Sequence, residues 1–241
     1  MEVVIITGAS KGIGLQLYKQ FNEAGAVVYG FARTNPDELE RMEKVDITDY
    51  ENAKNTLQEI LVRHKEKATS FTLINNAGVI DPISLVGALD SIEVEQAMKV
   101  NLTAPIQLTN TFIETLATYQ GTKKILNISS GAGRHPYEGW SIYCTTKAGL
   151  DHFSRVVSEE QKVAQHPVGI VSIAPGIIDT GMQETIRSAS NKQFPHLQKF
   201  ISYKKEGLLS TPEDTASNIL RFVRETDFMR TETIADIRHI D

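Results

Sequence analysis

A tyrosine and a lysine lie one helical turn apart in the segment YCTTK, residues 143–147. Because residues four apart share a face of a helix, the ammonium group of Lys147 can lie on the Tyr143 side of a bound ligand. A cation in that place would lower the pKa of the phenol from about 10 toward neutral pH and make Tyr143 a general acid or base. Many helices carry this pair by accident, so its meaning depends on the polar residues that the fold brings beside it.

A serine is the first candidate partner. Ser130 precedes Tyr143 by the length of a loop that could return and place the two hydroxyl groups on one carbonyl oxygen. Ser129 competes with Ser130, but neighbours in a strand point to opposite faces, so only one of the two can enter the site.

An asparagine is the second candidate, through its backbone. Pro105 has no N–H to give to the carbonyl of Asn101, so a helix over this stretch should kink and leave that carbonyl free. The carbonyl could then hold a water that Lys147 also binds, which would connect Tyr143 to bulk solvent. A kink that solvent alone relieves is the alternative.

Two small-residue loops indicate a nucleotide site. TGASKGIG, residues 7–14, follows an apolar strand-like run and precedes a helix-like run. Glycines at such a junction let the backbone turn tightly and approach a pyrophosphate, which the N–H groups at the start of the helix bind. NNAG, residues 75–78, ends another predicted strand and leaves room for a ribose and an adenine, with a plain strand-to-helix turn as the alternative. Together the two loops predict a shared dinucleotide site.

The end of the second predicted strand indicates which dinucleotide fits. An acidic residue there would bind the ribose 2′-hydroxyl and repel a 2′-phosphate, but the sequence reads YGFART, residues 29–34. Arg33, with Lys11 of the glycine loop, could pair with a 2′-phosphate, which favours NADP(H) over NAD(H). Asp46 follows the third predicted strand and could accept a hydrogen bond from the adenine amino group, with an exposed turn aspartate as the alternative.

Short β-branched runs alternate with segments of helical period along the chain. This alternation predicts an α/β fold with a doubly wound, seven-stranded parallel sheet in a single domain, residues 1–241. The strands are continuously apolar, so helices should cover both faces of the sheet. One long helical stretch is expected over residues 89–118. Residues 181–206 break the rhythm and are expected to form a helical lid over the substrate, with a hairpin that merely packs on the sheet as the alternative.

Composition limits the possible partners. The chain has 241 residues, a net charge of -5 and one cysteine, Cys144. Without a run of basic residues, nucleic acid is not expected as a partner, and no apolar run approaches the roughly 20 residues that would cross a membrane. A single thiol makes a metal cluster improbable, and we expect Cys144 to be a small packed residue. These features predict a cytoplasmic protein.

The motifs together resemble those of a known family, the short-chain dehydrogenases/reductases. TGxxxGxG at 7–14, NNAG at 75–78, YxxxK at 143–147 and the PG pair at 175–176 occur in the family's order and spacing, as do the asparagine and serine described above. The resemblance covers nearly the whole chain and implies a homo-oligomer, a dimer or a tetramer. The implied catalytic tetrad is Asn101, Ser130, Tyr143 and Lys147. The residues expected to bind NADP(H) are Gly8, Ser10, Lys11, Gly12, Ile13, Gly14, Arg33, Asp46, Asn76, Ala77, Gly78, Tyr143, Lys147, Pro175, Gly176, Ile178 and Thr180.

A closer resemblance concerns the substrate. Residues 127–149 and 174–190 are similar to those of the bacterial benzil reductases, a sepiapterin-reductase-like branch of the family. This implies reduction of one carbonyl of an aromatic 1,2-diketone to an (S)-hydroxyketone. Apolar and aromatic residues fit such a substrate better than a sugar or a charged acid, and Phe194 and Phe200 are expected to close from the lid. The residues expected around the substrate are Ser130, Tyr137, Trp140, Met182 and Ile186.

Other functions stay open. The runner-up within enzymes is reduction of a pteridine side-chain carbonyl, for which Asp236 or Asp241 could anchor the ring, or reduction of a 3-oxoacyl thioester on a carrier protein. A different class is a regulator that binds NADPH without catalysis. An altered tyrosine or lysine would be its sign, and both residues are present.

Overall fold

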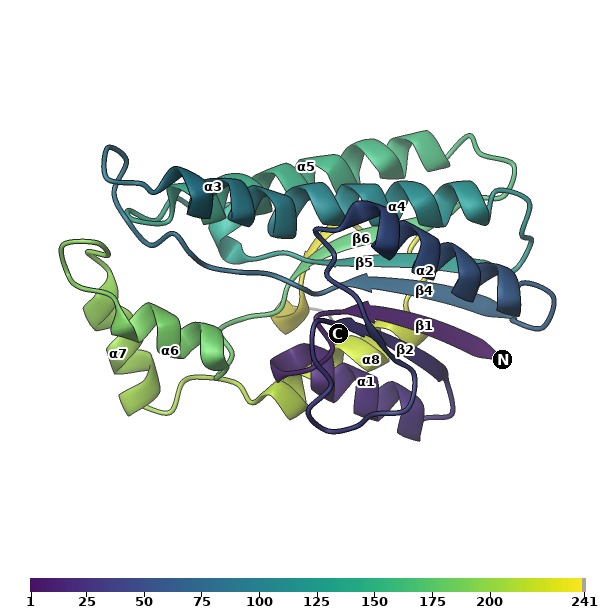
Figure 1. Cartoon of the computed structure of the whole chain (residues 1–241), viewed down its shortest axis with the longest axis horizontal. Helices are drawn as coiled ribbons and strands as arrows, with labels where there is room; N and C mark the ends of the chain where they lie inside the picture. Colours follow the sequence, from purple (N-terminus) through teal and green to yellow (C-terminus); the bar gives the residue numbers. More distant parts are fainter. Residues whose placement is uncertain (240–241) are drawn as a thin grey trace.

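A parallel sheet forms the centre of the protein, whose computed structural model describes residues 1–239. All of its pairings are parallel, in the order β3-β2-β1-β4-β5-β6-β7. The predicted α/β fold with seven parallel strands is therefore confirmed (Figure 1). The strands are β1 (Glu2–Thr7), β2 (Val27–Ala32), β3 (Met42–Lys44), β4 (Ser70–Asn75), β5 (Thr122–Ile128), β6 (Gly169–Ala174) and β7 (Ile234–Asp236).

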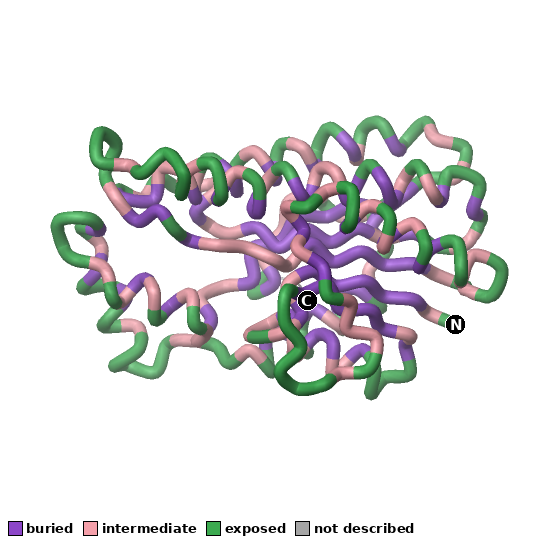
Figure 2. Tube along the Cα trace, in the orientation of Figure 1, coloured by how far each residue is buried: buried purple, intermediate pink, exposed green. Residues whose placement is uncertain are grey.

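Helices cover the sheet on both faces. Along β1, Val3 and Ile5 pack in the core cluster that contains α2 (Tyr50–His64), α4 (Ala104–Thr115) and α5 (Ser141–Gln161). Val4 and Ile6 pack in the cluster that contains α1 (Gly12–Glu23) and α8 (Pro212–Glu225). Successive side chains of a strand point to opposite faces of the sheet, and helices cover both faces here. Each strand therefore needs apolar residues at consecutive positions, without alternating polar ones. Figure 2 shows the strands as the most buried part of the chain.

The order of the strands defines where a ligand can bind. Within the sheet, β2 is the neighbour of β1 on one edge, and β4 is its neighbour on the other edge. The loops after β1 and β4 therefore diverge at a topological switch point, and the crevice at the carboxyl ends of such strands is the usual ligand site of a doubly wound sheet. The glycine loop follows β1 and the NNAG segment ends β4, so both lie at this crevice.

The long helical stretch predicted over residues 89–118 is a composite. It contains α3 (Ser91–Met98), a π-helical turn η1 (Lys99–Thr103) and α4. Asp90 caps the start of α3 by accepting from the N–H groups of Ile92 and Glu93. The expected irregularity before Pro105 thus takes the form of a π turn, which widens the helix by one residue and often marks a functional site.

Residues 181–206, the segment predicted to be a lid, contain two helices, α6 (Gly181–Ser188) and α7 (Leu197–Lys205), which extend beyond the sheet at the left of Figure 1. Phe194 and Phe200 pack there in a third cluster with Trp140 and Tyr143. The two helices are thus attached to the start of α5 by aromatic contacts as well as packing on each other.

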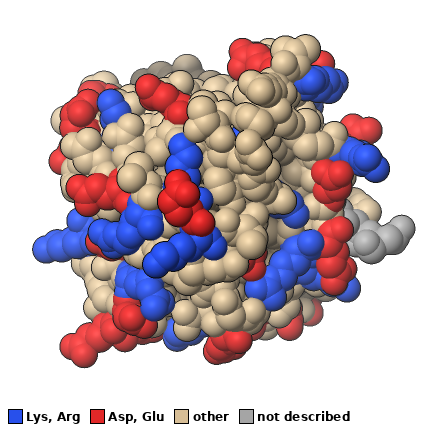
Figure 3. All heavy atoms as spheres, turned by 90° about the vertical axis from the view of Figure 1, so that its right-hand side faces the viewer, with Lys and Arg blue, Asp and Glu red and all other residues tan. Residues whose placement is uncertain are grey.

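The face at which β1 begins carries interspersed acidic and basic side chains, so no patch of one sign covers it (Figure 3). Within residues 1–239, no helix combines the length and the apolar character that crossing a membrane requires.

Candidate active site

The glycine loop between β1 and α1 has a backbone conformation that favours glycine. Gly8 and Gly12 have φ angles of +69° and +55°. A Cβ atom on Gly14 would lie 2.2 Å from the carbonyl oxygen of Gly8, closer than atoms can approach. Larger residues are thus excluded at these positions, and the backbone remains accessible to a ligand.

Helix α1 begins without a side-chain cap. Among the described residues, none caps its first turn with a side chain, and the turn itself contains no acidic residue. The first N–H groups of α1, together with the helix dipole, therefore form a favourable site for an anion. Ser10, Lys11, Gly12 and Ile13 all lie at this start of the helix, in a position to contact a pyrophosphate.

Thr7 joins the glycine loop to the NNAG segment. Its hydroxyl accepts hydrogen bonds from the N–H groups of Asn76 and Ala77, both at 3.0 Å. The side-chain amide of Asn76 donates in return to the carbonyl oxygens of Thr7 and Gly8. A Cβ atom on Gly8 would lie 2.9 Å from the Cα of Ala77. Thr7 had no place among the predicted site residues, because its role depends on a strand that is distant in the sequence.

A basic residue, Arg33, directly follows β2, and another, Lys11, lies in the glycine loop. Arg33 and Lys11 are both exposed, and no carboxylate occupies the last positions of the strand. Asp46 accepts from the backbone N–H and the hydroxyl of Thr48, at 2.9 and 2.8 Å. Burial by itself raises the pKa of Asp46, but these hydrogen bonds and the charge of Arg33 hold it below its usual value. Asp46 is therefore a turn-forming carboxylate next to the predicted adenine site.

Asn101 lies in the π turn η1 and is fully buried. Its Oδ1 accepts from the N–H of Val79 and its Nδ2 donates to the carbonyl of Val79, each at 2.8 Å. Nδ2 also lies 3.4 Å from the hydroxyl of Thr146, which donates to the carbonyl of Tyr143. The side chain of Asn101 thus connects the segment after β4 to helix α5. A water bound to the Asn101 carbonyl stays a prediction.

Ser130, Tyr143 and Lys147 come together where β5 ends and α5 begins. Nζ of Lys147 lies 5.7 Å from the ring centroid of Tyr143 and donates to the carbonyl of Ile128 at 2.7 Å. The Ser130 hydroxyl accepts from the N–H of Ala132 and lies close enough to the phenol of Tyr143 to act on its pKa. Of the two competing serines, Ser130 is the one beside the phenol. Ser129 is buried, and its hydroxyl donates to the carbonyl of Lys147 at 3.5 Å.

The NNAG segment reaches the same place. A Cβ atom on Gly78 would lie 3.4 Å from Oδ1 of Asn101 and 3.7 Å from Nζ of Lys147. Because Gly78 has no side chain, the space beside Nζ of Lys147 stays open on the side of the site opposite α5.

The predicted effect of Lys147 on Tyr143 is wrong for this state of the protein. Burial raises the pKa of Tyr143 to about 12, and the neighbouring Ser130 hydroxyl opposes this only in part. Burial also lowers the pKa of Lys147 to about 8, against the charge of Asp151, which raises it. Both side chains are nearly inaccessible to water, so desolvation disfavours the charged form of each and is the largest cause of both shifts.

The loop after β6 approaches the glycine loop from the other side. Gly176 has a φ angle of +91°, and Pro175 before it is buried. Ile178 pairs with Ser210 in an isolated parallel bridge. A Cβ atom on Gly12 would lie 3.5 Å from the methyl group of Thr180. The segment expected to contact the nicotinamide thus lies beside the start of α1.

The aromatic residues predicted to surround the substrate form a packed cluster. Trp140 stacks on Phe194 with ring centroids 4.6 Å apart and packs edge-on against Tyr143. Trp140 and Ile186 are buried in this cluster together with Tyr143, and their contact with a substrate stays a prediction. Tyr137 and Met182 are half-buried and remain accessible.

Fold and site together define an α/β oxidoreductase of the dinucleotide-binding type. A family model described as short chain dehydrogenase matches residues 2–191, and the chain belongs to the short-chain dehydrogenase/reductase family, as its motifs predicted. The benzil reductase ((S)-benzoin forming) of Bacillus subtilis (strain 168) is 38% identical over 93% of this chain and 94% of its own. The benzil reductase ((S)-benzoin forming) of Bacillus cereus is 36% identical over 97% of this chain and 98% of its own. The crystal structure of the KRED1-Pglu enzyme superposes with a TM-score of 0.80 at 28% identity, over 94% of this chain and 97% of that one.

Members of this family use NAD(P)(H), and the residues of this chain fit such a group. The uncapped start of α1 suits a pyrophosphate, and the space around Gly8, Gly12 and Gly14 admits backbone contact. The absence of a side chain at Gly78 leaves room next to Lys147. No cluster of three metal-ligating side chains occurs within residues 1–239.

Proposed function

We propose that the protein is an NADPH-dependent carbonyl reductase that converts one carbonyl group of a hydrophobic aromatic 1,2-diketone into an alcohol, as in the conversion of benzil to (S)-benzoin. The observation that carries this proposal is the convergence of Ser130, Tyr143 and Lys147 beside a wall of aromatic side chains. The similarity to two bacterial benzil reductases supports the substrate class.

The hydroxyl groups of Ser130 and Tyr143 would hold the carbonyl oxygen of the substrate and polarise it. A nicotinamide held by Ile178 and Thr180 would supply the hydride that the carbonyl carbon accepts. Tyr143 donates its proton to the oxygen as negative charge develops there, which completes the alcohol. A pKa of about 12 keeps the phenol protonated at neutral pH, and an alkoxide is basic enough to take that proton. A water at the Asn101 carbonyl, with Lys147, would return a proton to Tyr143.

Three features support the choice of NADPH over NADH and of an aromatic diketone over a pterin. Arg33 is exposed directly after β2, where the strand offers no carboxylate, and Lys11 is exposed in the glycine loop; both cations favour a 2′-phosphate. The cluster around Trp140 and Phe194 is apolar, and a pocket that it borders would favour flat aromatic rings. The carboxylate of Asp236 accepts three hydrogen bonds from the backbone and guanidinium of Arg238, so it is already occupied. Its use as a pterin anchor is thereby less favoured, and Asp241 lies outside the described residues.

The test is the rate of NADPH or NADH oxidation with benzil, sepiapterin, a simple ketone and an acetoacetyl thioester. We expect the highest kcat/KM for benzil with NADPH. A preference for sepiapterin or for the thioester would transfer the proposal to the corresponding alternative. NADPH binding without oxidation in the presence of any of these substrates would indicate a sensor.

Substitution of the phenol separates catalysis from folding. Tyr143→Phe should lower the rate by about 100-fold or more, because the proton donor is lost. Tyr119→Phe is the matched control: Tyr119 is also buried and hydrogen-bonded, but to Ala68 on the side of the sheet where the strands begin. A Tyr143→Phe rate within a few-fold of the wild type would refute the assignment.

A further inference from the structure

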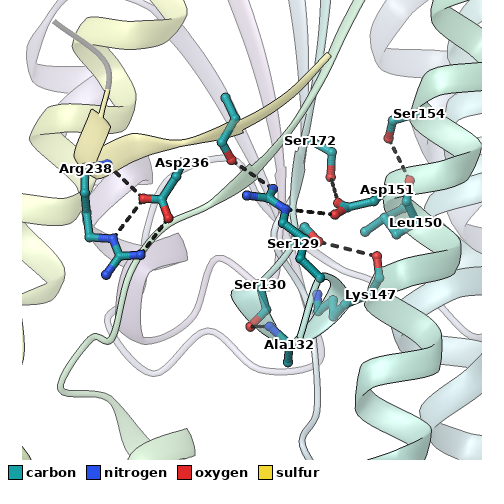
Figure 4. Close-up of polar contacts among 12 residues, drawn as sticks. Ser129, Ser130, Ala132, Lys147, Leu150, Asp151, Ser154, Ser172, Asp236 and Arg238 are labelled. Carbon is teal, nitrogen blue, oxygen red and sulfur yellow. Dashed lines mark hydrogen bonds and ion pairs between the residues drawn. The ribbon is translucent and has the colours of Figure 1, made fainter. Parts of the chain in front are cut away.

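A carboxylate lies buried one helical turn beyond Lys147. Asp151 is 2% exposed and follows Lys147 by four residues on α5, so the two side chains share a face of the helix. A buried carboxylate is costly unless both oxygens are satisfied. Oδ1 of Asp151 accepts from the hydroxyl of Ser172 at 2.7 Å, and Oδ2 accepts from Nε of Arg134 at 3.2 Å (Figure 4). The proposed mechanism leaves this group without a role.

Arg134 connects the carboxylate to the turn that carries Ser130. That turn is the short helix η2 (Gly131–Gly133), which Ser130 caps at its start and Arg134 at its end. Nη2 of Arg134 donates to the carbonyl of Ala235 in β7 at 2.9 Å. The guanidinium thus joins η2 to α5 and to the edge of the sheet at the same time.

The turn and the helix meet at Lys147. A Cβ atom on Gly133 would lie 2.8 Å from the backbone carbonyl carbon of Lys147, and the Ser129 hydroxyl also contacts that residue's carbonyl oxygen. A shift of η2 relative to α5 would therefore move Ser130 relative to both Tyr143 and Lys147. The pair of Asp151 and Arg134 opposes such a shift.

Few charged groups face the ammonium of Lys147. On its own helix these are Asp151 and the titratable phenol of Tyr143, and from η2 the nearest cation is Arg134, which Asp151 binds. The other contacts are neutral: the Ile128 carbonyl from β5, and Gly78 with Asn101 from the segments opposite. Asp151 is the charge that favours the ammonium form, against desolvation that disfavours it.

We propose that Asp151, fixed by Ser172 and Arg134, is a positioning residue of the active site, which keeps Lys147 in its charged form and holds the Ser130 turn against α5. The inference rests on the proposed roles of Ser130 and Lys147. It assigns two functions to one carboxylate: its charge acts on Lys147 through space, and its bond to Arg134 acts on Ser130 through η2.

The charge is tested in the cofactor-free protein by following the titration of Lys147 with NMR of lysine labelled at Cε, the signal being identified by its loss in Lys147→Arg. In Asp151→Asn the midpoint should fall by about one pH unit or more, because an attractive charge within one helical turn is removed. Asp236→Asn is the matched control, since it breaks another Asp–Arg pair, that with Arg238, but leaves α5 intact. Equal midpoints in the wild type and Asp151→Asn would overturn the proposed charge effect.

The positioning is tested by kinetics. In the wild type kcat for benzil should fall as pH rises through the Lys147 midpoint, and in Asp151→Asn this fall should occur about one pH unit lower, because the charged form of Lys147 is lost earlier. Arg134→Gln keeps the carboxylate, so its Lys147 midpoint should stay or rise, while kcat falls at every pH through the loosened turn. Asp151→Glu keeps the charge and should restore the Lys147 midpoint even if it packs poorly. If Asp151→Asn lowered kcat equally at all pH values and left the pH dependence of kcat unshifted, the role of Asp151 would be structural only.

These readouts separate the two proposals. A shifted Lys147 midpoint in a protein that does not reduce benzil would contradict the proposed function and retain the role of Asp151. An unshifted Lys147 midpoint in an active benzil reductase would contradict the role of Asp151 and retain the proposed function. If Asp151→Asn does not fold, Arg134→Gln and Asp151→Glu give the decisive comparison: a lower Lys147 midpoint in either one contradicts the proposal.

Discussion

Thr7 and Asn76 exchange hydrogen bonds in both directions across the carboxyl ends of β1 and β4. The N–H of Asn76 donates to the Thr7 hydroxyl, and the Asn76 side chain donates to the Thr7 carbonyl, each at 3.0 Å. Because the two loops diverge from adjacent strands at the switch point, this exchange fixes the distance between the glycine loop and the NNAG segment. The width of the dinucleotide crevice is therefore set by residues behind it.

Thr7→Val should widen that crevice without changing the volume of the side chain. The N–H groups of Asn76 and Ala77 lose their acceptor, and leaving buried donors unpaired costs about 1–3 kcal/mol. We expect the dissociation constant for NADPH, measured by fluorescence titration, to rise roughly tenfold. Thr111→Val is the control, because the buried Thr111 hydroxyl has no hydrogen-bond partner within residues 1–239. Unchanged NADPH binding in Thr7→Val would show that the loops are held by other contacts.

Arg33→Ser should reduce the preference for NADPH. The side chain is exposed next to Asp46 and outside the sheet, so its removal does not disturb the fold. A guanidinium paired with a 2′-phosphate contributes through charge-assisted hydrogen bonds, and we expect kcat/KM for NADPH to fall by about tenfold or more while that for NADH stays constant. Arg230→Ser, which removes an 88% exposed arginine elsewhere, is the control. An unchanged ratio of the two cofactors would exclude Arg33 from the site.

Local patterns predicted the elements and loops of this fold because their determinants are local. The glycine loop is encoded by glycines at positions with positive φ, and the strands by apolar runs that pack on both faces. The contribution of Pro105 was also predictable, since a missing N–H disturbs a helix wherever it occurs. Its outcome is a π turn in which Asn101 bonds to Val79 through both its amide oxygen and its amide nitrogen. This outcome depends on a segment more than twenty positions earlier in the chain.

Burial explains what could not be predicted at the site. The sequence places a cation near a phenol, which by Coulomb attraction alone would lower the phenol's pKa. The fold surrounds both groups with protein, and desolvation moves the pKa of Tyr143 upward instead. The contact of Asp151 with Ser172 and Arg134 joins three separate segments, and no local pattern in the sequence indicates it.

The raised pKa of Tyr143 predicts how stability depends on pH. The folded value of about 12 exceeds the ordinary value of 10.0, so between these values the unfolded chain loses the proton and the folded protein keeps it. The free energy of unfolding should therefore fall as pH rises from about 10 to about 12, by about 2–3 kcal/mol from this group. Urea unfolding of the wild type and Tyr143→Phe across this range measures it as the difference between the two curves. A difference that does not change with pH would contradict the burial effect.

Lys147 contributes with the opposite sign at lower pH. Its folded pKa of about 8 lies below the ordinary 10.5, so the unfolded chain binds more protons between these values, and stability should rise as pH increases through them. Lys147→Met removes this dependence, because no charged form has to be desolvated. Urea unfolding between pH 8 and 10 should show a steeper rise for the wild type than for Lys147→Met. Parallel curves would mean that the buried ammonium is stabilised as fully as it is in water.

Phe194→Ala should weaken substrate binding without affecting the cofactor. The ring of Phe194 is fully buried, stacks on Trp140 and lies 5.3 Å from that of Phe200, so its removal leaves a cavity that costs about 3–5 kcal/mol where neighbours cannot collapse. The loosened wall should raise KM for benzil several-fold, while the NADPH dissociation constant stays constant because α1 and the loops after β1 and β4 are untouched. Phe228→Ala is the control: Phe228 is similarly buried, but it packs against α8 in a different core cluster. It should lower stability and leave KM for benzil unchanged. If both variants changed KM equally, global destabilisation would account for the effect, and the aromatic cluster would have no specific connection to the substrate.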